Sequence, residues 1–114
     1  MKSEKTTQVR LFELQASICQ TFSNPWRLRV VETLGEGEMS VTELASALGA
    51  PKTKISQHLA IMREKQVVVS RSSGGFVYYS LSDLRILQAC RLMRQVLVDR
   101  LKLAGHLVRS EPPS

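Results

Sequence analysis

Residues 40–81 restrict the fold more than any other part of the chain, because two short helical patterns are followed there by two strand-like runs. Ser40 followed by Glu43 is a capping box, which marks a helix start. Gly49 is expected to end this helix, because glycine readily adopts the left-handed conformation found after helices. Pro51 is placed to start a second helix. The apolar residues at helical spacing are Val41, Leu44, Ala45 and Leu48, then Ile55, Leu59 and Met62.

Two helices joined by a tight turn form a helix-turn-helix, whose second helix can enter the major groove of DNA. Gln57 can pair bidentately with adenine, whereas lysines suit phosphate or guanine and small hydroxyl side chains are less selective. The predicted DNA-facing residues are Lys52, Thr53, Lys54, Ser56, Gln57 and His58. The plainer interpretation is a two-helix corner with a solvated polar face.

A β-hairpin is predicted after the second helix. Residues 67–71 and 76–81 are rich in β-branched and aromatic side chains, and the polar stretch 72–75 between them contains two glycines. A hairpin at this place is the wing of a winged helix. Its predicted contacts, with the DNA backbone or minor groove, are Arg71, Ser72, Ser73 and Gly74.

The charge distribution supports a polyanionic partner. Residues 51–75 hold five basic residues and one acidic residue, so they carry +4 of the chain's net charge of +6. Residues 32–43 hold four glutamates and no basic residue, so this segment is expected to face away from DNA.

Further helices are predicted on both sides of this segment. The apolar pattern becomes helical from Val9, and Ser23 or Asn24 can cap a helix that Pro25 opens. On that helix we expect a partly buried Trp26. Its two arginines, at 27 and 29, can reach DNA phosphates, but we favour ion pairs with the glutamates at 32 and 36.

The last predicted helix begins after Ser82 and runs to about Gly105. Its apolar stripe is wider than the small domain beneath it requires, which favours pairing with a second copy of the chain. The alternative is a helix folded back on its own core.

The chain is long enough for one domain with a modest core. We expect a single winged-helix DNA-binding domain over residues 1–114, with disordered tails at 1–7 and 109–114. The fold class is mainly α: four helices, a small β-hairpin and a fifth helix. No run approaches ~18 apolar residues and the N-terminus lacks a signal-peptide core, so we expect a cytoplasmic protein without a membrane partner.

The runs SNPWRLRVVETL, SVTELASALGAPKTKISQHLAIMREKQVV and SRSSGGFVYYSLS resemble the ArsR/SmtB family of winged-helix repressors over residues 9–104. The most specific parts are Asn24-Pro25 with the Arg-Leu-Arg that follows, the helix KISQHLAIMRE and the wing ending at Leu81. The resemblance implies a homodimer formed by the first and last helices. It also implies binding to an inverted-repeat DNA operator that an inducer releases. Pro51 departs from the family, which often has a small hydroxyl residue there, so Thr53 takes over the phosphate contact of that turn.

Two ion sites that the resemblance implies for metal-sensing members lack their ligands. Ser40 and Thr42 stand at the thiol positions of the arsenite-type site. On the last helix Asp83 and Asp99 stand at carboxylate positions of a zinc site, but Arg85 and Val96 stand where histidines are needed. Zinc favours cysteine and histidine ligands, so no zinc site is expected there.

The two cysteines are the remaining candidates for sensing. Cys19 and Cys90 fall on the first and last predicted helices, which the resemblance packs together. One interpretation is a thiol switch: oxidation, reactive sulfur, or capture of a soft metal or metalloid lowers operator affinity. A nearby Arg91 or Arg94 would lower a thiol pKa. The other interpretation is two buried cysteines that fill core space.

A winged helix also allows other functions. The fold could serve protein–protein contact, or it could bind DNA constitutively without an inducer. An enzyme is not expected, because the sequence shows no glycine-rich phosphate loop and no nucleophile–base grouping. The lone histidines are not expected to bind metal, and His106 is expected to be exposed to solvent.

Overall fold

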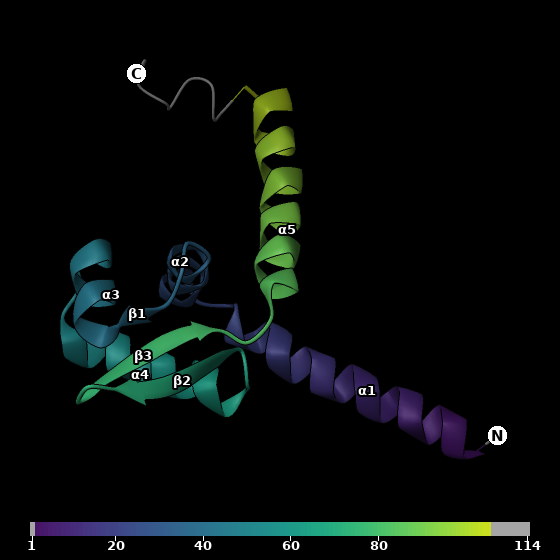
Figure 1. The fold of residues 1–114 in the computed structure, drawn as a ribbon. Helices are drawn as coiled ribbons and strands as arrows, with labels where there is room; N and C mark the ends of the chain where they lie inside the picture. The colour runs from purple at the N-terminus through teal and green to yellow at the C-terminus, as the bar shows by residue number, and fades with distance from the viewer. Residues whose placement is uncertain (1, 106–114) are drawn as a thin grey trace.

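The computed structural model describes residues 2–105 of the chain. Its helices and strands follow the predicted order, with one additional short strand (Figure 1). They are α1 (Lys2–Thr21), α2 (Pro25–Leu34), β1 (Met39–Ser40), α3 (Val41–Leu48), α4 (Lys52–Glu64), β2 (Val68–Ser73), β3 (Phe76–Leu81) and α5 (Leu84–Leu103). The predicted fold class, a mainly α winged helix-turn-helix, is confirmed. The predicted tail at 109–114 and His106 lie outside the described residues.

The hydrophobic core lies among α2, α3, α4 and the base of the wing. Six of the seven residues predicted to point inward from the helix-turn-helix are buried, and Val41 is half-buried at the edge. Among residues 6–105, the buried apolar residues are Val30, Val31, Leu34, Leu44, Ala45, Leu48, Ile55, Leu59, Met62, Val67, Val68 and Leu87. The helical spacing in the sequence therefore identifies the faces that pack.

The ends of α3 explain the tight turn of the helix-turn-helix. The Glu43 amide donates to Ser40 Oγ (3.2 Å) and the Ser40 amide donates to Glu43 Oε1 (3.0 Å), which completes the predicted capping box. Gly49 has φ +63°, and the Ala50 amide donates to Ala45 O at 3.0 Å. This is a Schellman ending, so the prediction that Gly49 stops the helix is confirmed.

The end of α4 repeats this geometry without a glycine. Gln66 adopts φ +60°, and the Val67 amide donates to the Met62 carbonyl at 2.9 Å. The chain therefore turns directly from α4 into the wing. At the other end of α4, Pro51 is the N-cap residue and supplies no side-chain cap.

The sheet has the order β1-β3-β2 and is antiparallel. Ser73 pairs with Phe76, so the wing tip is a two-residue turn. Gly74 and Gly75 have φ +57° and +83°, as a type I′ turn requires. The tip is thus shorter than the predicted stretch 72–75, because its two serines belong to β2. The sequence did not predict β1, which has only two residues. It pairs with β3, and Ser40 lies opposite Tyr78.

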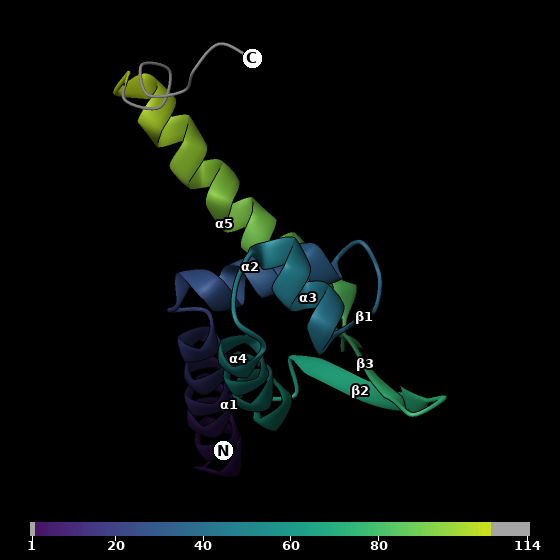
Figure 2. The same cartoon turned by 90° about the vertical axis from the view of Figure 1, so that its left-hand side faces the viewer.

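Two long helices project from this core as separate arms (Figures 1 and 2). Helix α1 begins at Lys2, earlier than the apolar pattern from Val9 indicated. Residues 2–7, which we expected in a disordered tail, continue the helix, because helix hydrogen bonds are local and do not need an apolar face. No helix within residues 2–105 is apolar enough over a sufficient length to cross a membrane.

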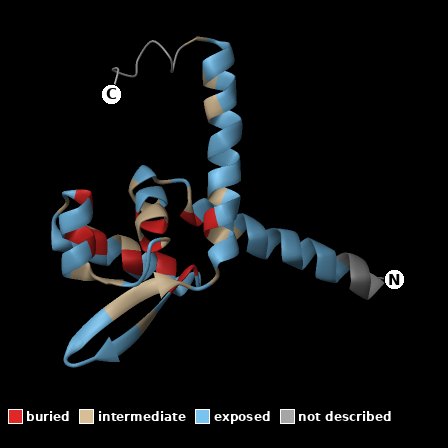
Figure 3. Cartoon of the chain, turned by 45° about the horizontal axis from the view of Figure 1, so that its top comes forward, coloured by how far each residue is buried: buried red, intermediate tan, exposed pale blue. Residues whose placement is uncertain are grey.

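Helix α5 touches the core only near its beginning. Leu87 is its single buried residue, and it packs where Gly35 at the end of α2 has no side chain. A Cβ at Gly35 would lie 2.4 Å from Leu87 Cδ2, so the two elements approach closely there. Beyond this contact most residues of both arms are exposed (Figure 3). α5 is therefore not folded back on its own core.

Candidate nucleic-acid interface

The polar face of α4 is the centre of the candidate site. Four of the six residues predicted to face DNA are exposed on it: Lys52, Thr53, Ser56 and Gln57. The opposite face of the helix is locked into the core, where Ile55 and Met62 are 0% exposed and Leu59 is 1% exposed (Figure 3). This division leaves the first two turns of α4 free to present hydrogen-bonding side chains outward.

The other two predicted residues of α4, Lys54 and His58, are half-buried and face α2. Lys54 Nζ lies 4.0 Å from the ring centroid of Trp26. Arg29 Cζ lies 4.6 Å from the same centroid, and the Arg29 guanidinium donates to the Leu48 carbonyl at 3.3 Å. Trp26 thus holds a cation from α2 and a cation from α4. This arrangement could not be predicted from the sequence, because no local pattern links residues of α2 to a lysine so far along the chain.

Arg27 joins α1, α2 and α4. Its Nε donates to the Thr21 carbonyl at 2.6 Å, and its NH1 lies 3.5 Å from Nδ1 of His58. Burial lowers the pKa of His58 below its usual value, and the charges of Arg27 and Lys54 lower it further. The imidazole is therefore neutral near neutral pH, and Nδ1 can accept from Arg27.

The predicted ion pairs of Arg27 and Arg29 with Glu32 and Glu36 are wrong. Glu32 instead accepts from Arg91 (2.7 Å) and from Arg94 of α5 (3.0 Å). The helical turn of α2 directs the glutamate toward the arm and the two arginines toward α3 and α4. The cations beside α4 consequently have no carboxylate partner among the described residues.

In the wing, Arg71 is held by a carboxylate. Both Nε and NH2 of Arg71 donate to Glu38, with Nε 2.8 Å from Oε2, and the guanidinium lies 5.2 Å from the Tyr78 ring centroid. The hydrogen bond lowers the pKa of Glu38 and raises that of Arg71. Glu38 belongs to the acidic segment that was expected to face away from DNA, yet it contacts one of the predicted wing residues. The remaining predicted wing residues, Ser72, Ser73 and Gly74, are exposed at the tip.

Comparison with known proteins fits this geometry. Residues 24–70 match the model of the arsR family of bacterial regulatory proteins. An uncharacterized HTH-type transcriptional regulator of Mycobacterium tuberculosis (strain ATCC 25618 / H37Rv), Rv0081, is 34% identical over 88 residues, which cover 76% of this chain and 77% of that protein. The chain belongs to the ArsR family.

Other ArsR-family comparisons agree. The crystal structure of Rv0081 superposes with a TM-score of 0.74 at 32% identity, over 83% of this chain and 96% of that one. The biofilm growth-associated repressor of Xylella fastidiosa (strain Temecula1 / ATCC 700964) is 33% identical over 89 residues, 78% of each chain. The winged-helix domain of Mb0332 from Mycobacterium bovis, described as homodimeric and DNA-binding, shares the fold (TM-score 0.76, 24% identity, 83% of this chain and 88% of that one). Rv0081 and the Xylella fastidiosa protein are described as a transcriptional regulator and a repressor, in agreement with the prediction of a regulator and not an enzyme.

The two cysteines of this ArsR-family chain occupy different environments, and neither forms a disulfide. Cys19 is exposed on α1, whereas Cys90 is half-buried on α5 against the core. Burial raises the pKa of Cys90; the charge of Arg94 opposes this, while Glu32 and Cys19 add to it. The charge of Arg94 lowers the Cys90 pKa, as predicted, but burial outweighs it, so the net shift of this pKa is upward.

The candidate zinc positions are also engaged in other contacts. Asp83 caps α5 and pairs with Arg85 (2.7 Å), which lowers the pKa of Asp83 to about 2. Asp99 accepts from Gln95 Nε2 at 2.8 Å. Within residues 2–105 no three His, Cys, Asp or Glu side chains lie together in a way that could hold a metal ion.

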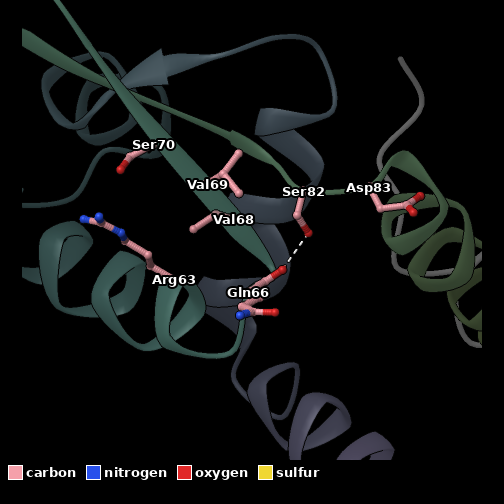
Figure 4. A pocket seen from close by; sticks show the side chains of 7 residues that line it. All are labelled: Arg63, Gln66, Val68, Val69, Ser70, Ser82 and Asp83. Carbon is pink, nitrogen blue, oxygen red and sulfur yellow. Dashed lines mark hydrogen bonds between the residues drawn. The ribbon is translucent and has the colours of Figure 1, made fainter.

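A shallow cavity of about 580 Å³ lies between the C-terminal end of α4 and β2 (Figure 4). Its lining residues are Arg63, Gln66, Val68, Val69, Ser70, Ser82 and Asp83. β2 is an edge strand, and the Ser82 hydroxyl donates to the Gln66 carbonyl at 2.6 Å across the base of the cavity. The cavity is thus the open gap beside the wing, away from the exposed N-terminal turns of α4.

Proposed function

We propose that this chain is a homodimeric transcriptional repressor that places α4 in the major groove of an inverted-repeat DNA operator. The observation that carries the proposal is the division of α4. Its buried face fixes the helix, and its exposed face offers Lys52, Thr53, Ser56 and Gln57 within two turns. Side chains of these types read base edges and phosphates. The wing tip, with its exposed serines, would lie beside the helix at the backbone or minor groove.

The dimer part of the proposal rests on the two arms. Many large apolar side chains are exposed on both arms, and exposed apolar surface of this extent is typical of a protein–protein contact. On α1 these are Val9, Leu11, Phe12, Leu14 and Ile18, and on α5 they are Leu84, Leu92, Met93, Val96, Leu97 and Leu103. A second copy would cover both surfaces, and a two-fold dimer would present two copies of α4 to the two halves of an inverted repeat.

The test is duplex binding by fluorescence anisotropy, with the operator first selected from a random library. Gln57→Ala is expected to relax base preference while leaving binding to unrelated duplex nearly unchanged. Lys52→Ala is expected to weaken binding to all duplexes alike and to reduce the salt slope by about one. If wild type binds no duplex even at low salt, the protein-interaction alternative replaces this proposal.

The proposal extends to release of the operator by thiol chemistry. The exposed Cys19 and the half-buried Cys90 lie on the two arms, so a change at either thiol would bias the arrangement of the dimer. In an oxidative version the two thiols form a disulfide, losing two protons and passing two electrons to an oxidant such as diamide. In a metalloid version the two thiols form two As–S bonds to arsenite, and two arsenite hydroxyls leave with the thiol protons as two water molecules.

This extension is tested by measuring operator affinity for the reduced protein and after diamide, polysulfide or arsenite. Cys19→Ser and Cys90→Ser are treated in parallel with wild type. A loss of affinity that either substitution abolishes would support the thiol switch. Equal affinity in every sample would favour constitutive DNA binding and leave the cysteines as packing residues.

A further inference from the structure

The cations around Trp26 form a surface beside α4 that the helix-turn-helix itself does not explain. We call Trp26, Arg29 and Lys54 the tryptophan clamp. Lys54 Nζ lies 4.0 Å and Arg29 Cζ lies 4.6 Å from the Trp26 ring centroid. α2 contacts both α3 and α4, so the clamp lies where these three helices meet (Figure 2).

Two positive charges held at one ring repel each other unless something compensates them. No carboxylate pairs with Arg29 or Lys54 among the described residues, because the nearby Glu32 is taken by the two arginines of α5. Arg27, the residue that follows Trp26, likewise has no carboxylate partner within residues 2–105, and its NH1 contacts the neutral imidazole of His58. The compensation available within the described residues is the Trp26 π-face and the Leu48 carbonyl, which are weak partners for two full charges.

The position of the clamp indicates which anion could pair with Arg29 and Lys54. Arg29 reaches the carbonyl of Leu48, the last residue of α3, and Lys54 stands in the first turn of α4. Both cations therefore flank the turn of the helix-turn-helix, immediately beside the residues proposed to enter the major groove. A helix lying in that groove has a sugar-phosphate strand along each side.

We propose that the tryptophan clamp binds the DNA backbone on the α2 side of α4, with Trp26 as the positioning residue that presents Arg29 and Lys54 to phosphate. This deepens the proposed function and rests on it. The wing would contact the backbone on the other side of the helix, so the clamp and the wing would hold α4 from two directions. Lys54 would then bind phosphate and would not read a base.

The primary test uses Trp26→Leu and Trp26→Phe. Leucine keeps an apolar side chain but removes the ring face, whereas phenylalanine keeps a weaker ring face. Duplex affinity is measured by anisotropy between about 50 and about 200 mM salt, on the selected operator and on an unrelated duplex. We expect Trp26→Leu to lose roughly 3- to 10-fold in affinity on both duplexes, with a smaller salt slope, and Trp26→Phe to recover part of each.

A second pair of variants keeps the test decisive if Trp26→Leu fails to fold. Arg29→Gln leaves the tryptophan in place and should lower the salt slope by about one on both duplexes. Lys102→Gln removes the same charge from the exposed far end of α5 and should leave the slope at its wild-type value.

The outcomes separate this inference from the proposed function. Wild-type binding with an unchanged slope in Arg29→Gln would overturn the clamp and leave the repressor proposal intact. A lower affinity at an unchanged slope in Trp26→Leu would also overturn it, since the tryptophan would then act only through packing. Absence of duplex binding by wild type would instead remove the proposed function itself.

Discussion

Helices α4 and α5 carry the same kind of apolar side chain at the same helical spacing, yet these side chains are buried on α4 and largely exposed on α5. Leu59 of α4 is 1% exposed, whereas Leu92 and Leu97 of α5 are 69% and 55% exposed. The difference is the presence of packing partners within one chain, since α4 has α2, α3 and the wing around it. The core is therefore complete in one copy, whereas both arms expose apolar side chains that a second copy would cover in the proposed dimer. Stability should divide accordingly into a part fixed by the chain and a part that depends on protein concentration.

Truncation of a buried core leucine should change stability the most. Leu59→Ala should lower the free energy of unfolding by about 2–5 kcal/mol, because the cavity left at a fully enclosed site cannot refill. Leu92→Ala removes the same atoms from an exposed site and should leave the unfolding of the dilute, monomeric chain nearly unchanged. Urea denaturation at low protein concentration measures both. Equal losses for the two variants would contradict the division.

A charge placed on the exposed apolar surface of α5 should weaken self-association. Leu97→Glu should weaken self-association by about tenfold or more, because it would place a carboxylate among apolar side chains of the second copy. Sedimentation velocity over a range of concentrations measures the dissociation constant. Gln88→Glu adds the same charge at another exposed position of α5 and is the matched control. If Leu97→Glu dimerises as wild type does, the apolar surface of α5 has another role.

The sequence predicted the core well because its signals are local. The capping box at Ser40, the left-handed Gly49 and the buried row with Ile55 each follow from a few neighbouring residues, and the structure has all three. The two-residue strand β1 escaped prediction, because a pair of residues shows no alternation and its partner at Tyr78 is distant in the chain. Other features that depend on contacts between distant residues could not be predicted for the same reason.

Only part of the candidate site was predicted, because the rest of it depends on contacts between distant residues. Residue type and helical position placed Gln57 and its exposed neighbours on the outer face of α4. The side chain of Lys54 turns instead to Trp26, a contact between α2 and α4 that sequence order does not suggest. The pairing of Glu32 with Arg91, 59 positions away, also redirected the arginines of α2. These contacts could not be predicted because the sequence does not show which helices pack against each other.

The wing and the clamp differ in that Arg71 of the wing has a carboxylate partner, whereas Arg29 and Lys54 of the clamp have none within residues 2–105. Glu38→Gln should free Arg71 and raise affinity for unrelated duplex by about 2- to 5-fold, with a salt slope steeper by about one. Glu36→Gln makes the same charge change at an exposed site that forms no ion pair among the described residues. Anisotropy titrations at several salt concentrations compare the two. Equal gains would show a general charge effect and not the release of Arg71.

The smallest effect concerns the joint between the two regions, where Glu32 of α2 binds Arg91 and Arg94 of α5. Hydrogen bonding from Arg91, reinforced by Arg94, lowers the pKa of Glu32 below its ordinary value of 4.5. The native state therefore binds this proton less readily than the unfolded chain does. The contribution to stability is fully present above pH 4.5 and is lost as the pH falls through the lower native pKa.

Glu32→Gln should consequently reduce stability near neutral pH, and the difference from wild type should disappear in acid. The side chain of Glu32 is 37% exposed, so solvent screens the pair and the effect should be about 0.2–1 kcal/mol. Thermal unfolding of both proteins from neutral to acidic pH measures it. Glu64→Gln, at an exposed glutamate without an ion pair among the described residues, should show no such convergence. A difference that persists in acid would mean that Glu32 joins the arm to the core through packing and not through its charge.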